Sequence, residues 1–207
     1  MNLASAVRRL FQRQRRTANS KRRTRCSPLS LEPLETRCLL TAAAAPLVID
    51  FGEGFYANGV TRLNDGTGLI VGEYIDPQTG QRDGRLYTIA PDGSSFNYTT
   101  LGSLGGSTGA FDISPNGQYI AGYSVSPTSD PRYTGEATIW RLQAPETAIG
   151  IGYVLNPGAP INESTAVSVS NNGVTVGHSN GGLIPFRWEE TVGMQALPGG
   201  GPPPQRG

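Results

Sequence analysis

The single histidine of the chain lies next to a serine in a run that imitates a catalytic motif. Residues 177–181 read Gly-His-Ser-Asn-Gly, which matches the G-x-S-x-G pattern of a serine nucleophile on a strand-to-helix turn. That chemistry needs a separate histidine as the base. On a strand, His178 and Ser179 point to opposite faces. We therefore expect Ser179 to be a structural residue, and we assign no catalytic residue.

Aspartates provide the candidates for a metal site. Asp76, Asp83 and Asp92 have the oxygen ligands that calcium prefers, but calcium takes six to eight such ligands and the chain has no EF-hand or calcium-binding nonapeptide. Aspartate near a turn usually bonds to its own backbone. We therefore assign no metal-ligating or cofactor-binding residue, and calcium is the one cofactor that these side chains would suit.

Aromatic side chains at strand ends allow two interpretations. A row of exposed rings would bind a sugar, whereas buried rings would pack neighbouring sheets together. The sequence favours packing for these four aromatic residues, which recur at similar places in the chain: Tyr87, Tyr123, Trp140 and Trp188.

A repeated phrase explains most of these positions. Residues 110–124 (AFDISPNGQYIAGYS) return as residues 166–179 (AVSVSNNGVTVGHS) and more weakly over residues 58–74. The turn glycines Gly66, Gly117 and Gly173 are 51 and 56 residues apart. A fixed period of this size is typical of arrays and propellers, and the Gly-His-Ser run occupies the same place in its copy as Gly-Tyr-Ser in the copy before.

Each copy predicts two hairpins. An alternating strand enters an Asn-Gly or Asp-Gly turn and a second short strand leaves it, and such dipeptides favour two-residue turns in which both residues have positive φ. A further pair of strands follows, beginning near residues 85–89, 136–141 and 183–188. The residues that we assign as structural repeat turns are Asp65, Gly66, Asn116, Gly117, Asn172 and Gly173.

Composition agrees with an all-β fold. The 207 residues include 28 glycines and 16 prolines with only 16% charged residues, as expected for a turn-rich β protein. We predict a propeller-like array of about three four-stranded antiparallel blades over residues 46–198, with copies at about 55–100, 101–155 and 156–198. Residues 1–45 form a leader that is disordered or partly helical, and residues 199–207 a disordered Gly/Pro tail.

Three blades leave the completeness of the array open, because closed propellers have four to eight blades. The chain is a fragment of a longer repeat protein, or it associates with a second copy to complete a ring, or it forms an open array with exposed edges.

Charge divides the chain into two parts. Residues 1–45 carry ten basic and two acidic residues, a formal +8, whereas the remainder carries seven basic and fourteen acidic residues, a formal −7. Nucleic-acid affinity depends on basic residues, so we expect no nucleic-acid binding by the body. No apolar run of 18 residues occurs, which excludes an ordinary membrane-spanning helix. Both cysteines, Cys26 and Cys38, lie in the leader.

The leader resembles a known type of export segment. Residues 30–46 (SLEPLETRCLLTAAAAP) follow a basic tract and are similar to the LEPR-XLL N-terminal segment of exported proteins from planctomycete-type bacteria. The resemblance implies export, although Glu32, Glu35 and Arg37 interrupt the apolar core that a secretory signal normally has.

The body resembles two families of repeats. Its alternation of Leu-Gly-x-Leu-Gly-Gly, Ile-Ser-x-Asn-Gly and Val-Gly-x-Ser with a strand ending in Trp is similar to HAF-type probable extracellular repeats, and residues 114–121 are similar to the Ser-Pro-Asp-Gly-Lys phrase of TolB-like propeller repeats. Pro185 within a strand and Pro198 in a linker depart from the pattern. The resemblance implies an extracellular repeat module and no particular reaction.

These observations lead to one functional hypothesis. We expect an exported, extracytoplasmic repeat protein that binds a protein or a cell-surface glycan and is not an enzyme. The alternatives are a secreted glycan-binding or hydrolytic enzyme, which would need a convergent catalytic cluster, and a fragment of a longer repeat protein.

Overall fold

The computed structural model describes residues 48–126, 135–154 and 162–198. The chain divides into two compact units, Met1–Pro46 and Leu47–Gly207, and every described residue belongs to the second unit. The predicted leader and the predicted Gly/Pro tail lie outside the described residues. In the part of the chain that the structure describes, no helix has the length and apolar composition that crossing a membrane requires.

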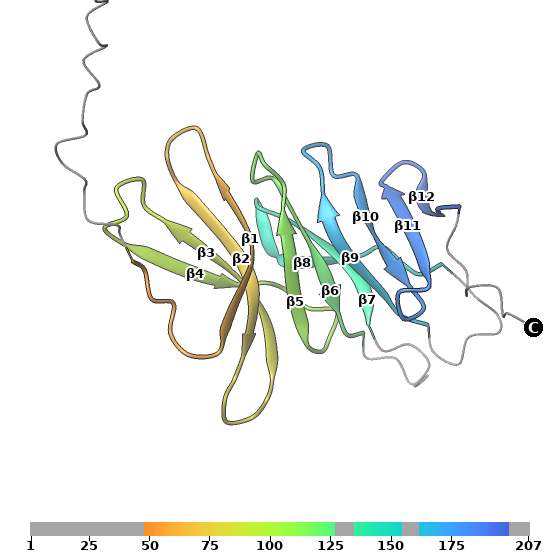
Figure 1. Cartoon of the computed structure of the whole chain (residues 1–207), viewed down its shortest axis with the longest axis horizontal. Helices are drawn as coiled ribbons and strands as arrows, with labels where there is room; N and C mark the ends of the chain where they lie inside the picture. The colour runs from red at the N-terminus through yellow and green to blue at the C-terminus, as the bar shows by residue number, and fades with distance from the viewer. Residues whose placement is uncertain (1–47, 127–134, 155–161, 199–207) are drawn as a thin grey trace, which may run out of the picture. The chain divides into compact units, whose positions relative to one another are not determined.

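Twelve strands form three antiparallel four-stranded sheets, each of which is a simple meander (Figure 1). Blade 1 contains β1 (Phe55–Arg62), β2 (Gly68–Ile75), β3 (Arg82–Ile89) and β4 (Phe96–Thr100). Blade 2 contains β5 (Thr108–Ile113), β6 (Tyr119–Ser124), β7 (Glu136–Arg141) and β8 (Ala144–Gly150). Blade 3 contains β9 (Ser164–Val169), β10 (Thr175–Ser179), β11 (Ile184–Glu189) and β12 (Gly193–Ala196). The prediction of an all-β, blade-like array is confirmed.

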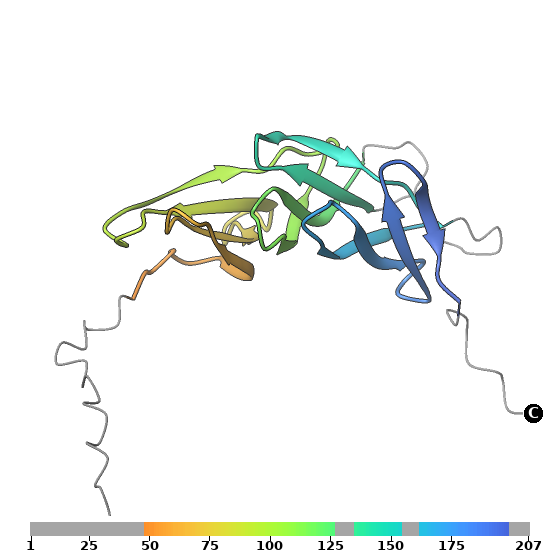
Figure 2. The same cartoon turned by 90° about the horizontal axis from the view of Figure 1, so that it is seen from above.

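Blade 2 lies between blades 1 and 3 in both views (Figures 1 and 2). One apolar core joins blade 1 to blade 2 around Leu86 and Trp140, and a second joins blade 2 to blade 3 around Ile139 and Trp188. Because blade 2 is covered on both faces, the four central residues of β7 are all buried, whereas every residue of β4 is exposed. Burial on both faces is why the centre of β7, Ala137 to Trp140, contains no charged residue and only one polar residue, Thr138.

The repeat turns have a different geometry from the one that the sequence predicts. Asp65–Gly66, Asn116–Gly117 and Asn172–Gly173 lie between the first and second strands of the three blades, but among these residues only the glycines have positive φ, at 90°, 72° and 76°. The amide of Gly117 donates to the Ser114 carbonyl, and the Ser114 amide donates to the Tyr119 carbonyl. The loop is therefore longer than a two-residue turn and ends in one left-handed glycine, so the expectation of positive φ at Asp65, Asn116 and Asn172 was wrong.

A second repeated glycine lies in the second strand of each blade, and a larger residue is sterically excluded there. A β-bulge interrupts the first strand of every blade, at Asn58, Phe111 and Val167. The bulge moves the first strand toward the second, so that a Cβ on Gly122 would collide with the carbonyl oxygen of Gly109. Gly72 and Gly177 have the same close contact in their own blades. The repeated glycine is therefore required by the bulge beside it.

A buried hydroxyl fastens each blade to the one before it. The amide of Gly84 in β3 donates to Thr108 Oγ1 at the start of β5, at 2.6 Å, and the amide of Ala137 in β7 donates to Ser164 Oγ at the start of β9, at 2.8 Å. Thr108 and Ser164 are 2% and 1% exposed. Each hydroxyl thus satisfies a backbone donor that the neighbouring blade would otherwise bury without a partner.

The residues at the two ends of the array do not have the groups for this hydrogen bond between a hydroxyl and a backbone amide. The register places Phe55 at the position of Thr108. Phe55 pairs with Tyr74 and Thr108 pairs with Ser124, and each of these partners is the second residue after the repeated glycine of its strand. Pro185 takes the position of Gly84 and Ala137. The Pro185 carbonyl accepts a hydrogen bond from the Leu197 amide, and the Gly84 and Ala137 carbonyls accept the equivalent bonds from the amides of Leu101 and Ile151. Phenylalanine has no hydroxyl and proline has no amide proton. Neither end face is therefore built for a further blade docked in the same way.

Replacing Thr108 by valine tests the fastening. Thr108→Val keeps the shape of the side chain and leaves the buried Gly84 amide without an acceptor, so we expect a loss of about 1–3 kcal/mol in the free energy of unfolding. Urea denaturation of the full chain measures this loss. Thr99→Val in the exposed strand β4 is the matched control and should change the free energy by less than about 0.5 kcal/mol. Equal effects of the two substitutions would show that the hydroxyl does not fasten the blades.

Candidate functional site

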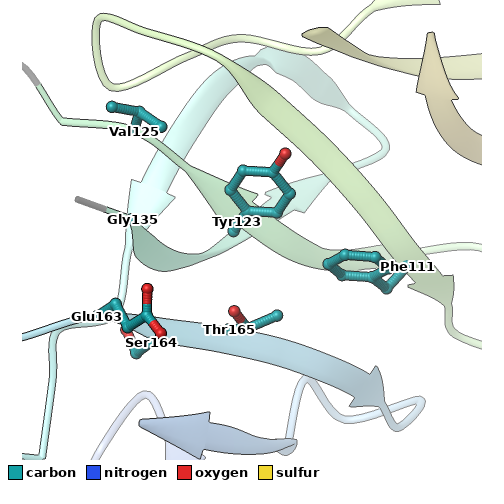
Figure 3. A pocket seen from close by; sticks show the side chains of 7 residues that line it. All are labelled: Phe111, Tyr123, Val125, Gly135, Glu163, Ser164 and Thr165. Atoms are coloured by element: carbon teal, nitrogen blue, oxygen red, sulfur yellow. The ribbon is translucent and has the colours of Figure 1, made fainter. Parts of the chain in front are cut away.

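A pocket of about 270 Å³ opens between blade 2 and blade 3. Strands β5 and β6 supply one wall and the start of β9 supplies the opposite wall, as Figure 3 shows. The lining residues come from both sides of the junction: Phe111, Tyr123, Val125, Gly135, Glu163, Ser164 and Thr165. Because two blades build it, the pocket depends on the packing of the junction.

Two stacked aromatic rings form the blade 2 wall. The ring centroids of Phe111 and Tyr123 are 5.8 Å apart with an interplanar angle of 28°. Phe111 is the bulge residue of β5, and the bulge is what places its ring beside that of Tyr123 on the next strand. The bulge therefore creates an aromatic surface that a regular strand would not have.

The hydroxyl of Tyr123 is held by a charged pair from blade 1. It donates to Glu73 Oε1 at 2.7 Å, and Arg82 Nη1 donates to Glu73 Oε2 at 2.9 Å. Burial, together with the hydrogen bond to Glu73, raises the pKa of Tyr123 to about 12. At neutral pH the phenol is therefore protonated and acts as a hydrogen-bond donor, not as a base or a nucleophile.

The blade 3 wall carries polar groups. Ser164 Oγ accepts from the Ala137 amide and donates to the Gly152 carbonyl at 2.6 Å, so this hydroxyl is committed to the junction. The carboxyl group of Glu163, which immediately precedes β9, and the hydroxyl of Thr165 in β9 lie across the pocket from the rings (Figure 3). A carboxylate and a hydroxyl facing an aromatic surface suit a small ligand that presents hydroxyl groups and one apolar face.

The Gly-His-Ser run has the structural place that the repeat predicts. Ser179 is fully buried, accepts from the Val154 amide and donates to the Glu163 carbonyl. Ser124, its counterpart in blade 2, accepts from the Leu104 amide in the equivalent linker. The turn after Ser179 leads into strand β11, not into the helix that a nucleophile elbow requires.

Two of the three aspartates that suited calcium, Asp76 and Asp92, are turn residues. Asp76 Oδ1 accepts from the Gln78 and Thr79 amides, and Asp92 Oδ1 accepts from the Ser94 amide. These backbone hydrogen bonds hold the pKa of both carboxyl groups below the usual value. Asp83 lies within β3. Within residues 48–126, 135–154 and 162–198, no three His, Cys, Asp or Glu side chains come together to hold a metal ion.

The four aromatic residues singled out from the sequence divide into two groups. Tyr87, Trp140 and Trp188 are 2%, 0% and 9% exposed and belong to the packing between and beside the sheets. Tyr123 alone lines the pocket. The partners of Tyr123 in this site, Phe111, Glu163 and Thr165, were not predicted, and the bulge that exposes Phe111 leaves no clear mark in the sequence.

A second pocket, also of about 270 Å³, lies at another part of the same junction and is lined by Gln118, Tyr119, Arg141, Gln143 and Glu190. Arg141 Nη2 and Glu190 Oε1 are 2.6 Å apart across this pocket. This pocket has one aromatic ring, that of Tyr119, whereas the first pocket has a stacked pair, so the pocket with the aromatic wall is the better candidate.

The structure thus defines a class: an array of propeller-type antiparallel blades with a small pocket between two of them. No protein-family model matches the chain, and no curated protein matches it. Among solved structures, the β-propeller domain of the Trilobed protease from Pyrococcus furiosus, described as having an open velcro topology, matches at 12% identity with a TM-score of 0.39. The match covers 72% of this chain and 45% of that chain, so the chain spans less than half the length of that structure.

The Tyr123 hydroxyl gives the stability a pH dependence. Its pKa is about 12 in the folded protein and about 10 in an unfolded chain. The unfolded state therefore loses this proton first, and the stabilisation is complete below about pH 10 and is lost as the pH rises to about 12. We expect phenolate absorbance to show a titration step near pH 12 that Tyr123→Phe removes. Tyr119→Phe is the control and should keep the titration step. A step near pH 12 that persists in Tyr123→Phe would contradict its assignment to Tyr123.

Proposed function

We propose that the chain is an exported binding module and that the pocket between blades 2 and 3 is its ligand site. The observation that carries the proposal is the pocket itself: a stacked aromatic pair from blade 2 faces a carboxyl group and a hydroxyl from blade 3 across about 270 Å³. This volume fits one sugar ring or a group of similar size, and aromatic faces with hydrogen-bond acceptors are what such a ring needs.

Binding without catalysis is supported by the state of the polar groups around the pocket. The Tyr123 phenol is held neutral by its surroundings, and the hydroxyls of Ser164 and Ser179 are both engaged in hydrogen bonds to the backbone. A hydrolase would need a nucleophile next to a base, or two carboxyl groups placed across the scissile bond. The groups that line the pocket include one carboxyl group, that of Glu163.

A hydroxyl-bearing sugar is the ligand class that the lining favours, and conservative substitutions test it. With the full chain and a panel of neutral mono- and disaccharides, we expect saturable binding by calorimetry for at least one sugar. Glu163→Gln and Thr165→Val should each lower its affinity about threefold to tenfold, as loss of one hydrogen bond does.

The controls are Glu53→Gln and Thr99→Val, which change the same residue types at exposed positions away from the pocket. They should leave the affinity unchanged. A panel without saturable binding would rule out the sugar ligand, and binding that both pocket variants leave intact would place the ligand site elsewhere.

Export is supported by the sequence of the leader. Residues 1–45 combine a formal charge of +8 with the segment that resembles LEPR-XLL, and the body resembles repeats that are known mainly as extracellular. An extracytoplasmic location is also where a module that binds cell-surface glycans or proteins would meet them.

A reporter fusion tests export apart from binding. Residues 1–45 fused to a phosphatase that needs disulfides, expressed in a planctomycete-type bacterium, should give activity outside the cytoplasm, because the cytosol keeps thiols reduced. The matched control carries the same 45 residues in scrambled order and should give none. Equal activity from both fusions, or activity from neither, would overturn the export proposal and leave the pocket proposal untouched.

A further inference from the structure

The side chain of Arg85 lies between two tyrosine rings on the outer face of blade 1, the sheet face that turns away from blade 2. Its Cζ is 3.4 Å from the ring centroid of Tyr74 and 4.4 Å from that of Tyr98. Tyr74 is in β2 and Tyr98 is in β4, so the guanidinium is clamped from both neighbouring strands. The clamp removes much of the freedom of a long side chain before any partner arrives.

Among the described residues no carboxylate forms an ion pair with Arg85, and this includes Asp83 on the same face of β3. The Nε atom of Arg85 is buried and makes no hydrogen bond. The cross-strand neighbours of Arg85 are Gly72 and Thr100, neither of which is charged. Arg85 as a whole is only partly buried, and a carboxylate that accepts two parallel N–H bonds is the best partner of a guanidinium group.

The surface around Arg85 is apolar and aromatic. Val60, Phe96 and Tyr98 on the same face are 72%, 43% and 52% exposed. The two pockets described above both lie between blades 2 and 3. A face with tyrosine, phenylalanine and a central arginine has the composition of a protein-binding hot spot, whereas small molecules prefer concave sites.

The corresponding faces of the other blades show what the fold places there. Trp140 in blade 2 and Trp188 in blade 3 occupy the position of Tyr87, and polypeptide from the preceding blade buries both. On blade 1 the rings of Phe51 and Phe55 pack on Tyr87, at 4.7 Å and 4.5 Å between centroids. The Arg85 end of the face receives no such cover from the described residues.

We propose that the outer face of blade 1 docks a partner polypeptide that presents an Asp or Glu side chain between apolar residues, and that this carboxylate pairs with Arg85. A second copy of this chain is a poorer partner, because Glu189 on the outer face of blade 3 already pairs with Arg187. The docking surface is independent of the pocket between blades 2 and 3.

Peptide pools test the proposal with the full chain. The probes are capped tripeptides with a central Glu flanked by Val, Ile, Phe or Tyr, and matched pools with a central Gln. The readout is the NMR resonance of the Arg85 Nε–H group. We expect at least one Glu pool to shift this resonance in a saturable way, and its Gln counterpart to bind at least tenfold more weakly, as loss of a charged hydrogen bond predicts.

Variants separate recognition from folding. Arg85→Gln should abolish binding of the Glu pool, followed by intrinsic fluorescence, and Arg85→Lys should weaken it, because lysine keeps the charge but not the planar fork. Arg62→Gln, in the same blade with its guanidinium bonded to the Gly66 carbonyl, is the control and should bind as the unaltered chain does.

Four outcomes would overturn the proposal. They are no saturable shift from any Glu pool, equal binding of the Glu and Gln pools, an Arg85 shift from free glucuronate or sulfate as tight as that from the best pool, and a dimer of the chain that Arg85→Gln dissociates. The third would assign the site to a small anion, and the fourth would assign the face to a second copy.

Discussion

The buried hydroxyl at each blade junction is the constraint on which the rest of the body depends. A four-stranded sheet cannot bury its apolar faces alone, so each blade needs a neighbour at a fixed distance and angle. Thr108 and Ser164 set that placement, because each must reach one backbone amide in the preceding blade. The apolar cores around Trp140 and Trp188 then fill the space that the two hydrogen bonds define.

The pocket depends on a side-chain pair that does not repeat, Glu73 and Tyr123. Glu73 in blade 1 and Tyr123 in blade 2 occupy the same position after the glycine of the second strand. The hydrogen bond between them draws the Tyr123 hydroxyl toward blade 1, which leaves its ring as a wall and opens space toward Glu163 and Thr165. The repeat therefore builds the frame, and one non-repeated pair of side chains produces the site.

The sequence predicts the parts of this structure that recur. The turn glycines, the paired strands and the structural role of Ser179 each appear more than once, so the pattern identifies them. The site could not be predicted in the same way, because the positions that match Phe111, Glu163 and Thr165 in the other copies carry different residue types. The junction hydroxyls were also missed: a threonine and a serine at strand starts are too common to signal a buried hydrogen bond. Pro185 stood out as a departure from the repeat, but only the register of β11 shows what its missing amide means.

The two end faces of the array differ in chemistry. On blade 3 the position of the buried Leu86 and Ile139 is taken by Arg187, which pairs with Glu189, so this face is suited to water. On blade 1 the outer face combines aromatic rings with Arg85, which forms no ion pair with any carboxylate among the described residues. A ring completed by a second copy would have to join these two faces without the hydroxyl that Phe55 lacks or the amide that Pro185 lacks. Such a ring stays a prediction, and it would need a junction of a different kind from the two that hold the three blades together.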